Sequence, residues 1–403
     1  MKIALSSAQE QLRAELRDYF AALVTPERRT ALAQASGEFG SSGEFGDATA
    51  YKEVIRQVGR DGWLGIGWPK EYGGQDRSMI DQLIFTDEAA IAGVPIPYLT
   101  LNTVGPTIMR FGTDAQRQEM LPKILTGDLH FSIGYSEPDS GTDLASLRTR
   151  ARLEGDEWVI NGQKMWTSLI QYADYVWLAC RTDPDLPRHK GLSMILVPAD
   201  SPGFSYTPVQ TLAGVGTSAT YYEDVRVPRD NLVGELNGGW ALMTNQLNHE
   251  RVALTSSAPV VHSIGQVVQW ARDTSVPSAG PGRAARVIDA EWVQTLLGRA
   301  HARADMLTLL NQQLATSTKD LSPADASATK VYGSELATEI YRSLMEVVGP
   351  DSLVRGDSPG AALRGRLERY HRSSLVMTFG GGTNEIQRDI IGYVGLGLPA
   401  AKR

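Results

Sequence analysis

The sequence predicts an α+β fold, with a block of helices, then a block of strands, then a second block of helices. Three observations predict this order. Apolar residues recur at helical spacing up to about residue 128, short β-branched and aromatic runs occupy about 131–233, and helical spacing returns after residue 238. Because helices and strands do not alternate along the chain, a doubly wound nucleotide-binding fold is not expected.

The first block begins with an amphipathic helix. Apolar residues stand at every fourth position from Leu12 to Phe20, with Gln, Arg and Glu among the residues between them. A repeated Ser-Gly-Glu-Phe-Gly follows at 36–40 and 42–46, and its glycines predict a mobile surface loop. Helical spacing then resumes, broken by glycines and prolines. We therefore expect an N-terminal α-helical domain of short antiparallel helices at 1–128.

The middle block consists of short runs typical of strands. They are Trp158–Ile160, Tyr175–Ala179 and Leu192–Val197. Asn161-Gly162 follows the first run, and Asn-Gly between two such runs is the usual signal of a tight hairpin. The sequence therefore predicts a central antiparallel sheet or barrel, which we place at 129–238.

The last block returns to helices after Gly238-Gly239. Long apolar faces occur at 267–271, 292–300 and 307–314. A stretch rich in glycine and proline, 276–282, separates two of these helices. We expect a C-terminal helical bundle at 239–403.

The composition narrows the classes of function. The 39 basic and 46 acidic residues give a net charge of −7, which argues against nucleic-acid binding. The single cysteine, Cys180, excludes an intrachain disulfide framework, and neither it nor the six dispersed histidines suggest a metal site. The amino terminus lacks the apolar core of a signal peptide, and no apolar run approaches the roughly 20 residues of a membrane span. A cytoplasmic protein without a membrane span is expected.

Four segments carry the chemical information, since the glycine-rich nucleotide loops, the serine-hydrolase elbow and the His-Glu-x-x-His motif are missing from the sequence. The segments are WPKEYGG at 68–74, YSEPDSGTD at 135–143, NGQKMWTS at 161–168 and GGTNEIQR at 381–388. In this order and spacing they resemble the acyl-CoA dehydrogenase family, from about residue 60 to the end. The resemblance implies an N-terminal helical domain, a central antiparallel β domain and a C-terminal four-helix bundle. It also implies an FAD-dependent oxidoreductase that acts on the CH–CH bond of an acyl-CoA thioester.

The second and third segments suit a flavin on chemical grounds. Ser136, Gly141 and Thr142 offer hydroxyls and bare backbone amides to a polar cofactor edge, and Trp166 offers a flat apolar wall. From the residues alone, the alternative is a simple turn and a core tryptophan. The resemblance favours the flavin. The cofactor-binding residues that it implies are Ile133, Tyr135, Ser136, Gly141, Thr142, Trp166, Thr167, Ser168, Thr383 and Glu385.

The resemblance also implies a carboxylate base that removes the α-proton while the β-hydrogen leaves as hydride to the flavin. In many members this glutamate directly precedes the Gly-Thr of the closing segment, but here that position is Gly381. A smaller group carries the base in a Glu-Arg pair on a bundle helix, which matches Glu250 and Arg251. Glu250 is the predicted base, and partial desolvation by substrate and flavin would raise its pKa. The alternative is a solvated pair of helix charges.

Substrate contacts follow from the same resemblance. Arg251 matches the position that contacts the pantetheine arm of CoA, and the Gly381 backbone N–H is placed to bind the thioester carbonyl. With Thr142 and Asn248 these residues make up the predicted substrate-binding set. The missing side chain at Gly381 leaves room for a bulky acyl group.

Two family segments that grip the flavin of a neighbouring subunit are degraded. Thr274 stands where the first has arginine, and 346–350 reads Glu-Val-Val-Gly-Pro where the second has Gln-x-x-Gly-Gly. This predicts an α2β2 heterotetramer with a related acyl-CoA dehydrogenase chain, similar to the bacterial enzymes that shorten steroid side chains, including that of cholesterol. An electron-transfer flavoprotein is the expected electron acceptor. The alternatives are a homo-oligomeric branched-chain acyl-CoA dehydrogenase, divergence with compensating contacts, and a non-catalytic scaffold subunit.

Overall fold

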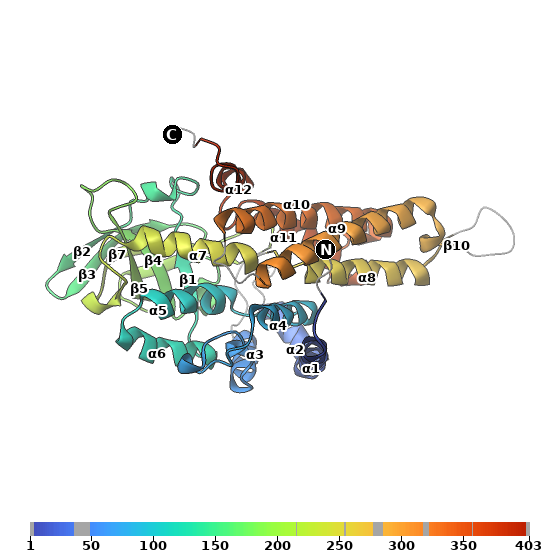
Figure 1. Cartoon of the computed structure of the whole chain (residues 1–403), viewed down its shortest axis with the longest axis horizontal. Helices are drawn as coiled ribbons and strands as arrows, with labels where there is room; N and C mark the ends of the chain where they lie inside the picture. Colours follow the sequence, from blue (N-terminus) through green and yellow to red (C-terminus); the bar gives the residue numbers. More distant parts are fainter. Residues whose placement is uncertain are drawn as a thin grey trace.

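The computed structural model describes residues 4–35, 49–214, 216–253, 255–276, 285–316, 322–356 and 358–399, without the side chains of residues 33–35, 247–253 and 364. Figure 1 shows the main sheet at one end of the molecule and the long helices of the carboxy-terminal half extending toward the other. The predicted order of helices, strands and helices is confirmed. The repeat at 36–46 lies outside the described residues. The exact boundaries at 1–128, 129–238 and 239–403 stay predictions.

The N-terminal domain is helical. Its helices are α1 (Ser7–Leu23), α2 (Pro26–Ala35), α3 (Thr49–Arg60), α4 (Met79–Ala92), α5 (Gly105–Phe111) and α6 (Asp114–Leu125). The Ser6 hydroxyl accepts a hydrogen bond from the Gln9 amide and so caps α1. Leu12, Leu16 and Phe20 are buried, which confirms the apolar stripe predicted for this helix.

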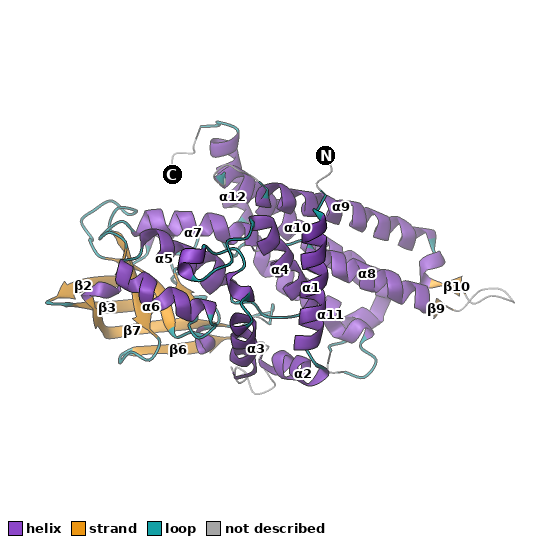
Figure 2. Cartoon of the chain, turned by 60° about the horizontal axis from the view of Figure 1, so that its bottom comes forward, coloured by secondary structure: helices purple, strands orange, loops and turns teal. Residues whose placement is uncertain are grey.

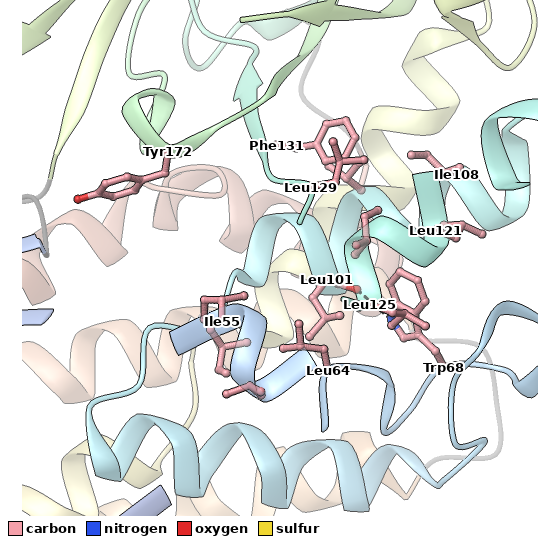
Figure 3. Close-up of a cluster of buried hydrophobic side chains, with 14 of the residues drawn as sticks. Ile55, Leu64, Trp68, Leu101, Ile108, Leu121, Leu125, Leu129, Phe131 and Tyr172 are labelled. Carbon is pink, nitrogen blue, oxygen red and sulfur yellow. Dashed lines mark hydrogen bonds between the residues drawn. The ribbon is translucent and has the colours of Figure 1, made fainter. Parts of the chain in front are cut away.

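The first of the four segments, 68–74, is a packed turn. Trp68 is buried, and its indole N–H donates to Leu101 O over 3.1 Å. A Cβ at Gly74 would come within 2.1 Å of Trp68 O, so this close approach of backbone requires glycine. Figure 3 shows Trp68 and Leu101 in a buried cluster that reaches Phe131 at the start of the sheet. This segment therefore joins the helical domain to the β domain.

The central sheet is antiparallel along most of its length. Its strands are β1 (Phe131–Gly134), β2 (Arg150–Glu154), β3 (Glu157–Lys164), β4 (Tyr175–Arg181), β5 (Leu192–Pro198), β6 (Phe204–Val209), β7 (Thr217–Pro228) and β8 (Leu232–Val233). They pair in the order β6-β7-β3-β2-β4-β5-β8, and β1 joins β4 in parallel. Strands β2 and β4 are also parallel where they meet. The predicted sheet is thus confirmed, with these two parallel pairings as additions.

Strand β4 separates two apolar clusters. Trp177 and Ala179 belong to the cluster shared with the N-terminal helices, whereas Val176, Leu178 and Cys180 belong to a cluster within the curved sheet. This is the alternation of side chains expected of a strand covered on both faces. Cys180 is a free thiol, and burial raises its pKa to about 12. It is not a reactive cysteine.

The predicted hairpin at Asn161-Gly162 is wrong. These residues lie inside β3, and the turn that joins β2 to β3 is at 155–156. The Asn161 side chain pairs across the sheet with Asp224, at the point where the register of β3 against β7 shifts. Gly162 has φ 153°, and a Cβ there would lie 2.5 Å from the Thr149 hydroxyl. The Asn-Gly pair therefore serves a bulged pairing and a close contact rather than a turn.

The C-terminal domain is a helical bundle, confirming the fold predicted from the sequence and the resemblance. Its helices are α7 (Gly239–Ala253), α8 (Ala258–Asp273), α9 (Glu291–Ala315), α10 (Pro323–Val348), α11 (Arg366–Ser374) and α12 (Asn384–Ile390). One core unites Val267, Ala304, Leu344 and Leu367, from α8, α9, α10 and α11 respectively. A two-stranded pair, β9 (Ser275–Val276) and β10 (Ala285–Arg286), stands between α8 and α9, and residues 277–284 lie outside the described chain.

The two helical domains and the sheet pack as one body. Figure 2 shows the strands of the main sheet gathered beside α5 and α6, and Figure 1 shows α4 between α1 and the bundle. In the described part of the chain, no helix is both long and apolar enough to cross a membrane. No group of three or more His, Cys, Asp or Glu side chains suited to a metal was found among these residues either.

Candidate active site

The structure brings two of the four segments together. The Met165 amide donates to Ser136 O over 2.8 Å, and the Lys164 ammonium donates to Tyr135 O over 3.0 Å. Residues 135–142 and 164–168, far apart in the sequence, are therefore one structural unit. Ile133, in β1 just before this unit, is half-buried.

Trp166 stands out from this unit. It is 54% exposed and has φ 65°, a backbone conformation unusual for a bulky residue. Its neighbour Thr167 is buried, and the Thr167 amide donates to Ser218 O over 2.9 Å. The Ser168 hydroxyl donates to that of Thr217. The alternative of a core tryptophan is thus wrong, because the chain anchors the residues after Trp166 and holds the ring at the surface.

A buried ion pair stabilises this unit. The Lys164 ammonium, which is fully buried, lies 2.9 Å from a Glu137 carboxylate oxygen. The same carboxylate accepts hydrogen bonds from the backbone amides of Arg148 and Thr149, at 2.7 and 2.8 Å. Glu137 therefore closes the loop from 137 to 149 on itself and joins it to β3.

The charge state of this pair follows from its surroundings. Burial opposes ionisation of Glu137, but the Lys164 charge and hydrogen bond, together with the two backbone amides, outweigh burial and lower the carboxyl pKa. Burial lowers the pKa of Lys164, and the Glu137 charge offsets part of that effect. Inside the β domain, the positive charge of Lys164 is thus compensated by the negative charge of Glu137.

The loop beyond Glu137 faces solvent. Gly141 and Thr142 are exposed, and a Cβ at Gly141 would meet no atom within 4 Å. A cleft of about 310 Å³ opens beside this loop, and its walls include Pro138, Ser140 and Arg148. The backbones of Glu137 and Ser140 also exchange hydrogen bonds, so this part of the segment is a turn. The segment therefore contains both the turn and, at 141–142, the open loop that the sequence suggested.

The residues around Trp166 fit a flavin. The buried Ser218 hydroxyl, in the residue whose backbone oxygen accepts from the Thr167 amide, has no hydrogen-bond partner within the described structure, and neither polar atom of the Gln171 side chain has one. Buried polar groups are rarely left unpaired, so donors and an acceptor are available to a polar ligand here. An exposed aromatic side chain and polar atoms without protein partners are the groups that an isoalloxazine ring, apolar on its faces and polar at its edge, requires.

The closing segment is a glycine turn at the start of α12. Gly381 and Gly382 have φ 68° and 95°. The Thr383 hydroxyl then accepts a hydrogen bond from the Ile386 amide and caps α12, while Glu385 is exposed. In the described part of the chain, residues 381–385 make no hydrogen bond to the unit formed by 135–142 and 164–168.

A second buried lysine holds this turn. Lys330, on α10, donates to Gly382 O and to the Asn384 side-chain oxygen, both over 2.8 Å. The side-chain nitrogen of Gln387 donates to Gly381 O over 3.4 Å, and the side-chain oxygen of Gln387 accepts a hydrogen bond from the Ser327 hydroxyl. The position of the turn is therefore set by α10.

The predicted base lies on α7. The helix includes Asn248, Glu250 and Arg251 in its backbone, but their side chains lie outside the described part of the structure. Just before them, Leu242, Met243 and Gln246 are buried. The roles assigned to Asn248, Glu250 and Arg251 stay predictions.

Sequence reasoning did not assign a role to Glu137, Lys164, Gln246 or Lys330. A charged residue at an inward strand position, as Lys164 is, was the available signal. Its partner stands 27 positions away in a different segment, however, and only the fold joins them.

Comparison with known proteins agrees with this architecture. The chain matches the family models of the acyl-CoA dehydrogenase N-terminal domain over residues 6–128, the middle domain over 132–225 and the C-terminal domain over 237–396. It is 61% identical to acyl-CoA dehydrogenase FadE26 of Mycobacterium tuberculosis and 44% identical to FadE29 of the same organism, over the full length of each chain.

Solved structures show the same relationship. A chain of the ChsE4-ChsE5 complex from Mycobacterium tuberculosis matches with a TM-score of 0.90 and 62% identity, over all of both chains. A chain of the Tcur3481-Tcur3483 steroid ACAD matches with a TM-score of 0.90 and 46% identity, again over all of both chains. Together with the fold and the paired segments, these matches show that the chain belongs to the acyl-CoA dehydrogenase family and is an acyl-CoA dehydrogenase.

Proposed function

We propose that this acyl-CoA dehydrogenase is an FAD-dependent subunit of an α2β2 heterotetramer. Its substrate is the CoA thioester of a steroid side chain of the cholesterol type, which it oxidises to the α,β-unsaturated thioester. Glu250 is the base, and an electron-transfer flavoprotein takes up the electrons. The predicted cytoplasmic location belongs to this proposal.

The observation that carries the assignment of the base is the glycine turn at 381–382. Both residues have φ values that glycine adopts at little cost, whereas a residue with a side chain is strained there. A carboxylate at position 381 would require a different turn. The Glu-Arg pair on α7 supplies the alternative that some family members use, so Glu250 is the candidate that remains.

The residues of this chain divide the work. FAD, when bound, supplies the acceptor for the β-hydrogen and its electron pair. Trp166 would line the face of the ring, Ser136, Thr167 and Ser168 would bind its polar edge, and Ile133 and Tyr135 belong to the same set. Thr383 and Glu385 complete the cofactor set from α12. Thr142, Asn248 and Arg251 hold the CoA part, the Gly381 N–H binds the thioester carbonyl, and Glu250 takes the α-proton.

Residues at the C-terminal ends of α8 and α10 support the proposal of a heteromer. Thr274 follows the end of α8, and the exposed Glu346 lies in the last turn of α10, where the family pattern has an arginine and a glutamine. A carboxylate there repels a neighbouring pyrophosphate. Two of the most similar solved structures are complexes of two different chains, ChsE4-ChsE5 and Tcur3481-Tcur3483, and the second is described as a steroid ACAD.

Flavin stoichiometry tests the heteromer. We expect the chain, co-purified with its partner, to carry about one FAD for every two protomers, measured by absorbance of the released flavin against protein concentration. A value near one FAD per protomer would instead support a homo-oligomeric branched-chain acyl-CoA dehydrogenase.

Replacement of the base tests the mechanism. Glu250→Gln keeps the shape of the side chain and removes the proton acceptor, so we expect kcat to fall by about 10²-fold or more with flavin content unchanged. Glu119→Gln, an exposed glutamate of α6, is the control and should keep full activity. Activity that survives in Glu250→Gln would leave the scaffold alternative standing.

A further inference from the structure

Two buried polar side chains of the bundle bind the glycine turn at 381–382. The side-chain nitrogen of Gln387 donates to Gly381 O over 3.4 Å, and the Lys330 ammonium donates to Gly382 O over 2.8 Å. Gln387 and Lys330 are fully inaccessible to solvent, so water does not compete for these contacts. The carbonyl groups of both glycines are therefore bound from within the protein.

The orientation of the Gln387 amide is fixed by a neighbour on α10. The Ser327 hydroxyl, which is also fully buried, donates to the Gln387 oxygen over 2.8 Å. The oxygen is thus occupied, and the nitrogen, the only donor of the side-chain amide, binds the turn. A Cβ at Gly382 would lie 2.6 Å from this nitrogen, so the missing side chain at position 382 permits the close approach.

The backbone of this turn has unusual conformational freedom. Gly380, Gly381 and Gly382 follow one another in the sequence, and glycine adopts left-handed and right-handed conformations at similar cost. Three consecutive glycines would otherwise sample many backbone conformations. A single orientation of the Gly381 amide therefore requires contacts from outside the turn.

Such contacts exist on both sides of the Gly381 amide. Before it, the Gly380 amide donates to Val376 O over 2.8 Å. After it, Gln387 binds the Gly381 carbonyl and Lys330 binds the next one. Because a trans peptide is planar, each bound carbonyl fixes the whole peptide unit to which it belongs. The Gly381 amide thus lies between anchored groups, and no described residue accepts a hydrogen bond from it.

We propose that Gln387, assisted by Lys330, is a positioning residue that holds the Gly381 amide in the orientation that binds the thioester carbonyl. The inference rests on the proposed role of this amide. Hydrogen-bond donors that are held in place before the reaction stabilise developing negative charge without reorganising during it. Gln387 takes no part in proton transfer, and it acts only through the backbone of the turn.

Gln387→Leu, in the complex with the partner chain, tests the proposal. Leucine removes the donor to Gly381 O, so we expect kcat to fall by about tenfold while KM changes by less than about threefold, because the held amide matters most in the transition state. Gln387→Met serves the same purpose if leucine disrupts folding. Flavin content and thermal unfolding, measured beside the kinetics, identify the variants that are folded and loaded with FAD.

A vibrational measurement separates positioning from a role in stability alone. The probe is the α,β-unsaturated CoA thioester of the steroid side chain, isotopically labelled at the thioester carbonyl, and the measured quantity is the carbonyl stretching frequency of the bound probe. A hydrogen bond to the carbonyl lowers this frequency. We expect a downshift in the wild type that is partly lost in Gln387→Leu. Ser327→Ala, which removes only the contact to the Gln387 oxygen, should cause a smaller loss.

Gln82 provides a matched control. It is a buried glutamine of α4 whose oxygen accepts from the Gly67 amide over 3.0 Å, and a Cβ at Gly67 would come within 2.8 Å of that oxygen. Gln82→Leu should lower stability and leave kcat and the carbonyl frequency unchanged. Wild-type kcat with a complete downshift in folded, flavin-loaded Gln387 variants overturns the inference. An equal loss of both in Gln82→Leu also overturns it, since the effect would then follow from stability.

A failure of the inference differs from a failure of the proposed function. Should the wild-type complex bind the thioester without a carbonyl downshift, the proposed role of the Gly381 amide is wrong, and the positioning role is wrong with it. Should the downshift be present in the wild type and remain complete in the Gln387 variants, the amide keeps its role and only the positioning by Gln387 is lost.

Discussion

Two partly enclosed carboxyl groups, Glu137 in the β domain and Asp87 on α4, have opposite responses to their surroundings. Glu137 is bound by an ammonium and two backbone amides, and its pKa is lowered. Asp87 accepts a hydrogen bond of 2.6 Å from the Ser256 hydroxyl, but burial outweighs this bond and the charge of Arg13, and raises its pKa to about 6. Asp87 also lines a cavity of about 20 Å³, room for one water molecule.

The two pKa shifts differ in direction because the two carboxyl groups have different partners. Desolvation acts on both, and only a nearby cation with several donors reverses it. The compensated carboxylate lies in the loop that the flavin is predicted to contact, whereas the less compensated one lies where the N-terminal domain meets the corner between α7 and α8. The charge of Glu137 stabilises a defined loop, whereas the contact between domains contains a carboxyl group whose pKa is raised to about 6.

The largest effect is expected from Lys164→Met. This change leaves the Glu137 carboxylate buried without its cation, which costs about 3–5 kcal/mol for a broken buried pair. We expect the loss in urea unfolding, together with reduced flavin content. The double variant Glu137→Gln with Lys164→Met should be more stable than Lys164→Met alone, and equal stability of the two would show that the pair does not account for the loss.

A smaller effect is expected from Lys330→Met. Lys330→Met removes the hydrogen bonds to two neutral acceptors, Gly382 O and the Asn384 side-chain oxygen. We expect about 1–3 kcal/mol of destabilisation. Since Lys330 holds the turn that contains Gly381, kcat should fall more than KM rises. Steady-state kinetics beside urea unfolding separates these effects, and a loss as large as that of Lys164→Met would contradict the comparison.

The smallest effect, with the opposite sign, is expected from Asp87→Asn. A carboxyl group whose pKa is raised on folding binds its proton more tightly in the folded state, so its contribution to stability falls as pH rises from about 4 to about 6. The amide keeps an acceptor for Ser256 and carries no charge. We expect the variant to gain about 1–2 kcal/mol over the wild type between pH 4 and pH 7.

Thermal unfolding at several pH values measures this gain. The lowered pKa of Glu137 gives the reverse trend, since stability from its ion pair is present above the ordinary carboxyl pKa of 4.5 and is lost as pH falls further. Glu137→Gln should therefore show a flatter acid slope than the wild type. A difference between Asp87→Asn and the wild type that does not change with pH would remove the contrast between the two carboxyl groups.

The order of the elements was predictable because it rests on local periodicity. The stripe from Leu12 to Phe20 and the strand runs at 175–179 and 192–197 all formed the expected elements. Asn161-Gly162 did not form the hairpin, because tertiary contacts to Asp224 and Thr149 overrode a local turn preference. The residue types indicated an irregular backbone at Asn161-Gly162, and the tertiary contacts determined that this irregularity is a bulge within a strand rather than a turn.

The site was predictable in part for the same reason. The motif resemblance selected the segments at 135–143 and 161–168, and the structure places them against one another with Trp166 exposed. The resemblance also selected Glu250, whose role stays a prediction. The support of these segments by Lys164 and Lys330 was not predictable, because these two lysines bind residues 27 and 52 positions away in the sequence.

The sequence by itself determined the three-block architecture, the family and the missing side chain at Gly381, since these depend on periodicity, on motif order and on residue identity. Only the tertiary structure decided that Glu137 meets Lys164, that the Tyr135 hydroxyl meets the side-chain oxygen of Gln246, and that Lys330 holds the closing turn. The physical reason is that the energy of a charge or a polar group depends on what surrounds it, and the surroundings exist only once the chain has folded.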